Sequence, residues 1–326
     1  MAARKQKAEG QMPTTITGTP SGIEIAYFTD PRGYKVRKGE GGGDVPTYDP
    51  MQPGWVEVPS VTTVLGVLDK PALSWWGMRV GIKGVFELWD KGLLSFTEDG
   101  RLAASVDAVW EYASPEDAGN IEKLLTENKI TVNHVRDAAG TRGQAAHDAL
   151  EEWAKDHSVV PDPKEYPPEE FEYLVALTKF IADMGDAFET GGVEIAVGSA
   201  EHGFAGRYDL RGRVLKDVKL VNRSLTKDGK GVLKSGHKHI VIPAGTKLLL
   251  DAKTSKSIYG THLLQLEGYE GASIEDGYEA TDMRAVIHLS GHGEYQFFPV
   301  PETVGYTEWL AVLTTYNAMT RVGEAL

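Results

Sequence analysis

Two charged residues at the end of one apolar segment have the types and spacing for catalysis. The leucines at 248–250 are followed by Asp251 and Lys253, with one alanine between them. An apolar run that ends in charges is typical of a buried strand that emerges at an active edge. Side chains alternate along a strand, so Asp251 and Lys253 share one face. A second carboxylate, Asp209, would lie beside Asp251 if their strands are antiparallel neighbours.

Two carboxylates this close repel each other unless a cation separates them. Mg²⁺ and Mn²⁺ favour oxygen ligands and leave positions for water and a phosphate. Such an ion would lower the pKa of a bound water and neutralise charge on the phosphate, while Lys253 orients or deprotonates that water. The pattern therefore predicts phosphodiester hydrolysis. An isolated Asp-x-Lys sequence is more often a surface strand end with an ordinary ion pair, and that alternative stays open.

Three further residues occupy helical segments. Gln265 and Tyr269 are four residues apart, so they share one helix face and could orient a phosphate backbone or a base. The alternative is an ordinary amphipathic helix with Tyr269 in the core. His147 lies in a helix whose other face is apolar. It is either a structural histidine or a neutral imidazole that completes a metal site.

Hydrophobic periodicity predicts an α+β protein. Residues 23–28 and 34–37 predict a β-hairpin that forms a peripheral ribbon. Beyond residue 168 the expected order is helix, three strands, helix, strand, strand, helix. Helices are expected at residues 60–94, 103–112, 115–127, 132–154, for about twenty residues after the prolines of 161–168, and at 259–272 and 304–322, and strands at 193–197, 203–214, 247–253, 283–289 and 294–300.

Composition narrows the class of protein. The chain has 326 residues, 41% of them hydrophobic, which is enough for a sizeable core. It contains no cysteine, which excludes disulfides, thiolate zinc sites and cysteine-held iron–sulfur clusters. No apolar run is long enough to cross a membrane, and the N-terminal residues lack the apolar core of a signal peptide. A cytoplasmic protein without a membrane partner is expected.

Basic residues concentrate in one segment of an acidic chain. Residues 211–247 hold ten Lys or Arg against two acids, about +8, whereas the whole chain carries -13. Two of these residues, Lys230 and Lys234, are candidates for gripping a DNA backbone, which would make affinity salt-dependent. The alternative is a solvated loop. Adjacent aromatics at Trp75 and Trp76 could stack on unpaired bases, but such pairs are more often core, and they are left out of the predicted site.

Four short motifs, taken in order, resemble those of the RecB-like branch of the PD-(D/E)xK nuclease superfamily. They are Gly143-x-x-x-His147, Gly206-x-x-Asp209, Asp251-x-Lys253 and Gln265-x-x-x-Tyr269. Residues 60–76 are similar to the segment that precedes the core in phage-encoded members. The resemblance covers residues 131 to about 300. It implies a restriction-endonuclease-like core, a small mixed sheet flanked by helices, at 131–326, after an N-terminal ribbon and helical segment at 1–130. The separation of Asp209 from Asp251 requires an insertion, placed at 212–247.

The resemblance also implies roles for single residues. His147, Asp209 and Asp251 would bind Mg²⁺ or Mn²⁺ with the Ala252 carbonyl, and Lys253 would be the catalytic lysine. Gln265 and Tyr269 would position DNA, and Glu194 matches an acidic position less tightly tied to catalysis. The implied activity is that of a DNA exonuclease of phage or bacterial recombination or repair type, with a recombinase or single-strand annealing protein as a partner. Two alternatives remain: a structure-specific or restriction-like endonuclease, and a DNA-binding protein without activity.

Overall fold

The computed structural model describes residues 13–29, 32–38, 54–68, 71–98, 101–106, 109–112, 119–224, 226, 233 and 236–325. The chain divides into two compact units. One consists of Met1–Leu68 with Gln144–Leu326, and the other of Asp69–Gly143. The division therefore differs from the expected boundary between residues 130 and 131, because the segment before Leu68 belongs with the C-terminal part of the chain.

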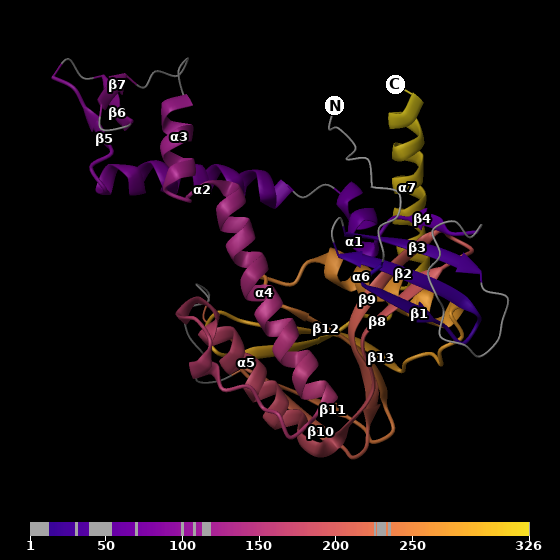
Figure 1. Cartoon of the computed structure of the whole chain (residues 1–326). Coiled ribbons are helices and arrows are strands. Elements are labelled where there is room, and N and C mark those ends of the chain that lie inside the picture. The colour runs from indigo at the N-terminus through magenta and orange to yellow at the C-terminus, as the bar shows by residue number, and fades with distance from the viewer. Residues whose placement is uncertain are drawn as a thin grey trace. The chain divides into compact units, whose positions relative to one another are not determined.

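The first unit is built on a five-stranded mixed sheet with the strand order β14-β13-β12-β9-β8. Figure 1 labels four of these strands, β8, β9, β12 and β13. Strands β12 and β13 are parallel, and the other neighbours are antiparallel. A parallel pair needs a crossover connection, which helix α6 (Gly260–Glu275) provides. The observed fold is mixed α and β, as the sequence predicts. The strands are β8 (Phe188–Ser199), β9 (Phe204–Val214), β12 (Lys247–Lys253), β13 (Met283–Leu289) and β14 (Tyr295–Pro299).

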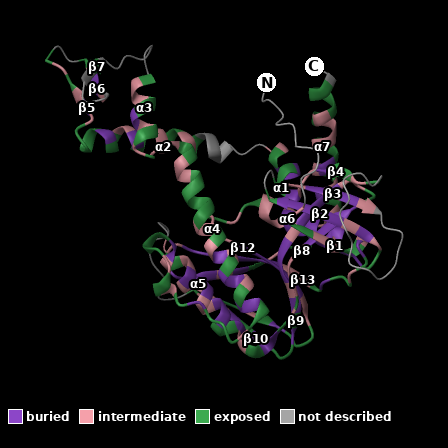
Figure 2. Cartoon of the chain, viewed as in Figure 1, coloured by how far each residue is buried: buried purple, intermediate pink, exposed green. Residues whose placement is uncertain are grey.

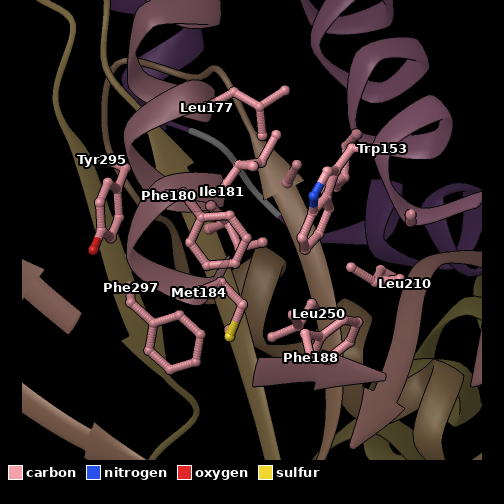
Figure 3. Packing of buried hydrophobic residues seen from close by; sticks show 14 of the residues in the cluster. Trp153, Leu177, Phe180, Ile181, Met184, Phe188, Leu210, Leu250, Tyr295 and Phe297 are labelled. Carbon is pink, nitrogen blue, oxygen red and sulfur yellow. The ribbon is translucent and has the colours of Figure 1, made fainter. Parts of the chain in front are cut away.

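One apolar core lies between this sheet and the helices α4 (Val132–Lys155) and α5 (Pro168–Met184). Figure 3 shows Trp153 of α4 and Phe180 of α5 in the same cluster as Leu250 of the sheet. Phe180 is fully buried, and burial of such a side chain stabilises the fold by about 2–3 kcal/mol. The core thus fixes α4 against the sheet. Single turns of 3-10 helix, η3 (Pro163–Glu165) and η4 (Gly185–Ala187), flank α5.

A second core contains side chains from alternate positions of the same strands. Leu249 belongs to it, whereas Leu248 and Leu250 belong to the first core, as strand alternation requires. Gly268 of α6 lets the Trp309 ring of α7 approach closely, since an added β-carbon would lie 3.0 Å from the ring. The helical segments of this core are α1 (Val61–Val64), η1 (Leu65–Val67), α6 (Gly260–Glu275) and α7 (Tyr306–Ala325).

The N-terminal strands are not the expected peripheral ribbon. The predicted hairpin is confirmed, but it is part of a four-stranded sheet with the order β1-β2-β3-β4. Ile25 and Tyr27 of this sheet form a buried cluster with Ala196 and Ala205 of the main sheet. Alternating apolar residues on β2 therefore have a buried partner surface. The strands are β1 (Thr15–Gly18), β2 (Ile23–Thr29), β3 (Arg32–Lys38) and β4 (Val56–Val58).

The expected insertion between β9 and β12 contains an antiparallel hairpin of β10 (Val218–Asn222) and β11 (Lys238–Ile242). Leu220 and Ile242 are fully buried in the first core. The base of the insertion is consequently an ordered part of the fold rather than a solvated loop.

The second unit has a small core of its own, with Leu88, Leu94 and Leu124 buried together. Within the segment 103–112, predicted as helix, the described residues 103–106 and 109–112 instead belong to two strands of a three-stranded sheet with the order β5-β6-β7. Within the described residues, no helix has the length and apolar character needed to span a membrane. The elements are α2 (Pro71–Asp90), β5 (Leu94–Phe96), β6 (Leu102–Val106), β7 (Val109–Tyr112) and α3 (Gly119–Glu127).

Candidate functional site

Strand register brings three carboxylates to one level of the main sheet. The last paired residues of β9 and β12 are Leu210 and Leu250, so Asp209 and Asp251 are the next opposed positions. On the other side of β9, pairing continues on both sides of Glu194 with a register that sets it opposite Asp209. Opposed residues of neighbouring strands project from the same face. Glu194, Asp209 and Asp251 therefore meet on three adjacent strands.

The Asp209 carboxylate links the strand ends to helix α4. Its Oδ2 atom lies 3.0 Å from His147 Nδ1. The same oxygen accepts a hydrogen bond of 2.7 Å from the backbone N–H of Ala252. This hydrogen bond joins β9 to β12 just beyond the last backbone pair of the two strands, Leu210 and Leu250. Asp209 is therefore held from two sides, and His147 is brought to the sheet as the sequence predicts.

Asp251 and Lys253 form an ion pair between Oδ2 and Nζ. The Asp251 side chain is 1% exposed and that of Lys253 is 18% exposed. A pair this buried costs desolvation energy that an exposed Asp-x-Lys pair would not. Its burial argues against the ordinary surface pair that remained open from the sequence.

The charges of the site act on one another. The Asp209 charge raises the pKa of His147 to about 9. Burial raises the pKa of Asp251 to about 6, although the Lys253 ammonium acts in the opposite direction. Burial opposes the charged form of Asp209, but His147, Lys253 and the Ala252 N–H together hold its pKa below the usual value. Burial likewise opposes charge on Lys253, yet Asp251 and Asp209 keep its pKa above the usual value. His147, Asp209 and Lys253 are therefore all charged at neutral pH.

Glu194 is more closely tied to the site than the sequence indicated. One ligand atom from each of His147, Glu194 and Asp209 lies within 4.8 Å of the others, a grouping that could hold a metal ion and that does not include Asp251. Burial, followed by the Asp209 charge, raises the pKa of Glu194 to about 7. Its φ of 51° is uncommon for a residue other than glycine and marks local backbone strain.

Arg207 is a residue of the site that sequence reasoning missed. Its Nε atom lies 2.6 Å from Glu194 Oε2, and its guanidinium lies 5.0 Å from the centre of the Tyr27 ring. The N-terminal sheet thus supports Glu194 through Arg207. A signal was present: Arg207 precedes Asp209 by two residues, so strand alternation puts both on one face.

Gln265 and Tyr269 are brought together as predicted, and Gln265 Nε2 donates a hydrogen bond of 2.6 Å to the Tyr269 hydroxyl. Gln265 is 8% exposed and Tyr269 is 4% exposed. Burial first, and the Asp251 charge second, raise the pKa of Tyr269 well above its usual value. The pair therefore lines the buried side of the site, next to Asp251, rather than its surface.

Gly206 has a steric reason to be glycine. A β-carbon at this position would lie 2.9 Å from Tyr269 Cδ1 and 3.0 Å from Val61 Cγ2. Because the Tyr269 ring is buried, it has little room to move. Gly206→Ala is expected to lower the free energy of unfolding by about 1–3 kcal/mol, measured by thermal or urea unfolding.

Two variants check this explanation. Gly260→Ala adds a β-carbon where nothing lies within 4 Å, so its stability should be close to that of the wild type. Replacing Tyr269 with leucine in the Gly206→Ala background removes the ring and should recover part of the loss. Equal unfolding midpoints for Gly206→Ala and the wild type would show that the ring does not fill this space.

The basic segment is partly neutralised by acids. Arg211, Lys216, Arg223 and Lys247 form ion pairs with Glu270, Asp186, Glu294 and Glu279, respectively. Arg213, Lys219 and Lys238 are exposed. The two candidates for contacts with DNA, Lys230 and Lys234, lie outside the described residues. The net positive charge of the segment is thus smaller at the base of the hairpin than the sequence count indicates.

Comparison with known proteins adds little. No family model matches the chain, and no curated protein matches it. Among solved structures, the crystal structure of SSO0001 is 12% identical over 55% of this chain and 88% of its own length, with a TM-score of 0.23. A likeness at that score carries no argument about fold or function.

Proposed function

We propose that this protein is a metal-dependent nuclease that hydrolyses phosphodiester bonds in DNA, on a PD-(D/E)xK core of the RecB-like kind. The observation that carries the proposal is the meeting of Asp209 and Asp251 at the ends of neighbouring strands, with His147 and Lys253 beside them. The order α5, β8, β9, β12, α6, β13 supports the same core. A fold alone does not define an activity, so the side chains carry the argument.

The donor set suits Mg²⁺ or Mn²⁺. It offers carboxylates and one imidazole, and the chain has no thiolate to favour softer metals. Apart from the Lys253 ammonium, no hydrogen-bond donor among the described residues reaches the buried Asp251 Oδ2. A buried carboxylate oxygen without such a donor is a candidate metal ligand. His147, Asp209, Asp251 and the Ala252 carbonyl would hold the ion, with Glu194 as an additional ligand.

When bound, the ion would acidify a water molecule and neutralise charge on the phosphate. Lys253 remains protonated because the carboxylates raise its pKa. It therefore orients the attacking water and stabilises negative charge on the phosphate, in preference to removing the proton from that water. Gln265 and Tyr269 hold the buried side of the site in place beside Asp251. They would therefore position the bound DNA indirectly, by fixing the side chains of the site that contact it.

Exonuclease action is the first form of the proposal, because the motif order resembles that of phage-type exonucleases. An endonuclease on the same fold is the second form. Closed circular DNA separates them, since an exonuclease requires an end. A DNA-binding protein without activity has no evident use for a buried lysine among carboxylates.

The test is a time course of DNA hydrolysis with Mg²⁺, with Mn²⁺ or with a chelator. The substrates are end-labelled linear duplex DNA, end-labelled single-stranded DNA, nicked circular DNA and closed circular DNA. We expect the linear substrates to be degraded only with metal, and closed circles to survive. Asp251→Ala purified in the same way is the control for contaminating nucleases. Equal hydrolysis by the wild type and Asp251→Ala, or none by the wild type with either metal, would refute the proposal.

A further inference from the structure

Helix α2 of the second unit presents a stripe of large apolar side chains to solvent. Trp75 is 67% exposed, Met78 49%, Ile82 50%, Phe86 68% and Trp89 42%. Successive members are three, four, four and three residues apart, so all five fall within roughly 80° of the helix circumference. Figure 2 shows exposed residues along much of α2.

The stripe is not the face of α2 that forms the core of its unit. The buried residues Gly84 and Leu88 lie on the other side of the helix. There, Leu88 packs with Leu94 and Leu124, and an added β-carbon at Gly84 would collide with Leu125. Both faces of α2 are therefore apolar, but only one is used within the unit.

The exposed area of the stripe is unusual. An aromatic side chain has a surface of about 150–250 Å². If Met78 and Ile82 are assigned the same range, the exposed fractions of the five residues add up to about 500 Å². Patches of this size on soluble proteins commonly mark a binding site. Single exposed apolar residues need no explanation, but five on one helix face do.

The stripe is symmetric about Ile82. Trp75 and Trp89 lie seven residues to either side of it, and Met78 and Phe86 lie four residues to either side. We propose that a second copy of this chain docks on this face, with the two α2 helices antiparallel and the two-fold axis passing at Ile82. Each Trp75 then meets the partner's Trp89, each Met78 meets the partner's Phe86, and Ile82 meets its own counterpart.

Charged residues line one flank of the stripe. Arg79 and Lys83 are followed on this flank by Asp90, whereas Glu87, five residues from Ile82, lies about 140° around the helix from it; all four are exposed. A two-fold axis between antiparallel helices brings this flank against the same flank of the partner, so each Arg79 lies within about one helical turn of the partner's Lys83. Burial of the stripe must therefore outweigh the repulsion between these two side chains.

The contact would be modest in size. Covering the stripe on both copies buries about 1,000 Å², near the lower limit for a specific interface. The dimer should therefore dissociate on dilution, with a dissociation constant in the micromolar range. The charged flank should make the dissociation constant depend on salt. Because Ile82 lies at the two-fold axis, one substitution there changes both sides of the contact at the same point.

The first experiment measures molar mass of the full-length chain by sedimentation over a range of concentrations. We expect a monomer of 35.5 kDa when dilute and twice that mass when concentrated. Ile82→Glu puts two carboxylates at the two-fold axis and should abolish dimerisation. Met319→Glu, at an apolar position of α7 that is 60% exposed, should not.

Charge reversal tests the orientation. Arg79→Glu puts a carboxylate beside the partner's Lys83 and should lower the dissociation constant, whereas Glu87→Arg, on the side of α2 away from the stripe, should leave it unchanged. Glu87 also pairs with Lys91, one residue beyond the end of α2, at 3.0 Å, so helix content of each variant is measured by circular dichroism. Equal dissociation constants for Arg79→Glu and the wild type would contradict the antiparallel pairing.

The absence of cysteine permits a cleaner test by cross-linking. Ile82→Cys should form a disulfide with its own copy on oxidation. Trp75→Cys alone should not, because antiparallel helices separate the two positions by about 21 Å, but it should cross-link when mixed with Trp89→Cys. Self-cross-linking of Trp75→Cys without that of Ile82→Cys would mean a parallel contact.

Other occupants of the stripe give different results, and each overturns the proposal. A chain that stays monomeric at all concentrations, with α2 tryptophan fluorescence quenched by a single-stranded oligonucleotide, would mean that the stripe stacks on bases. A monomer that Ile82→Glu destabilises would mean that the stripe is covered by the chain's own residues. A dimer that persists in Ile82→Glu would mean that another surface mediates association.

Discussion

Lys253→Met should abolish metal-dependent DNA cleavage, lowering the rate by about 10²–10⁴-fold. Lys253 provides the one cation that pairs with Asp251 in the described structure, and its pKa is held high by the surrounding carboxylates. Methionine has a similar length without the charge. Initial rates on end-labelled duplex DNA, with Mg²⁺ in excess, provide the measurement.

The same change should also destabilise the metal-free protein. Without the ammonium, the Asp251 carboxylate is 1% exposed and has lost its counter-charge, and breaking a buried pair typically costs about 3–5 kcal/mol. A double variant, Lys253→Met with Asp251→Asn, removes both charges and should recover most of the stability but no activity. This comparison separates the structural contribution of the pair from its catalytic one.

Lys155→Met is the matched control. Lys155 pairs with Glu151 on the surface of α4, with its side chain 63% exposed, and exposed pairs contribute little. Its stability and cleavage rate should match those of the wild type. Cleavage by Lys253→Met at the rate of Lys155→Met would remove Lys253 from the mechanism.

The residues of β12 show how far sequence alone could go. Alternation along one strand is a local property, so the shared face of Asp251 and Lys253 could be predicted without knowing the neighbours. The helix expected after the prolines of 161–168 is local in the same sense. The structure has α5 at Pro168–Met184, and Asp251 and Lys253 form an ion pair on their shared face.

Where tertiary pairing decides the conformation, local patterns failed. Residues 103–112 fit a short helix as well as a strand, and pairing with β5 selects the strand. The N-terminal hairpin was expected at the periphery because its sequence does not show what covers it. Its burial depends on Ala196 and Ala205, more than 150 residues away in the chain.

The candidate site divides in the same way. Its members were found because each lies in a short motif, but their grouping depends on register between strands. The structure groups Glu194 with His147 and Asp209, whereas the motif resemblance implied a lesser role for Glu194 and included Asp251 among the metal ligands. Strand alternation places Arg207 on the face of Asp209, but its pairing with Glu194 depends on the neighbouring strand, and the positive φ of Glu194 has no signal in the sequence.

Asp209→Asn should eliminate Mn²⁺ binding, with affinity at least 100-fold weaker by calorimetry. The amide oxygen can still accept the Ala252 N–H, so the strand ends remain joined, but the charge beside His147 is gone. In the metal-free protein the pKa of His147 should fall from about 9, because burial persists without the carboxylate. A histidine NMR titration measures this, with His147→Gln to assign the signal.

The free energy of unfolding should also depend on the Asp209 charge. The folded pKa of His147 is raised from 6.5 to about 9 by Asp209. The stabilisation is therefore fully present below about pH 6.5 and is lost as the pH rises through about 9. In urea unfolding without metal, wild type should exceed Asp209→Asn by on the order of 2 kcal/mol at pH 6, and the difference should narrow by pH 10.

Metal binding and this protonation compete for one nitrogen atom. A metal ligand must be a neutral imidazole, so Mn²⁺ binding near pH 7.5 should release about one proton from His147, detected by calorimetry in buffers of different ionisation enthalpy. His147→Gln should bind more weakly and release fewer protons. Unchanged Mn²⁺ affinity in Asp209→Asn would mean that the Asp209–His147 pair serves only to hold α4 against the sheet, and the proposed metal site would then have to be abandoned.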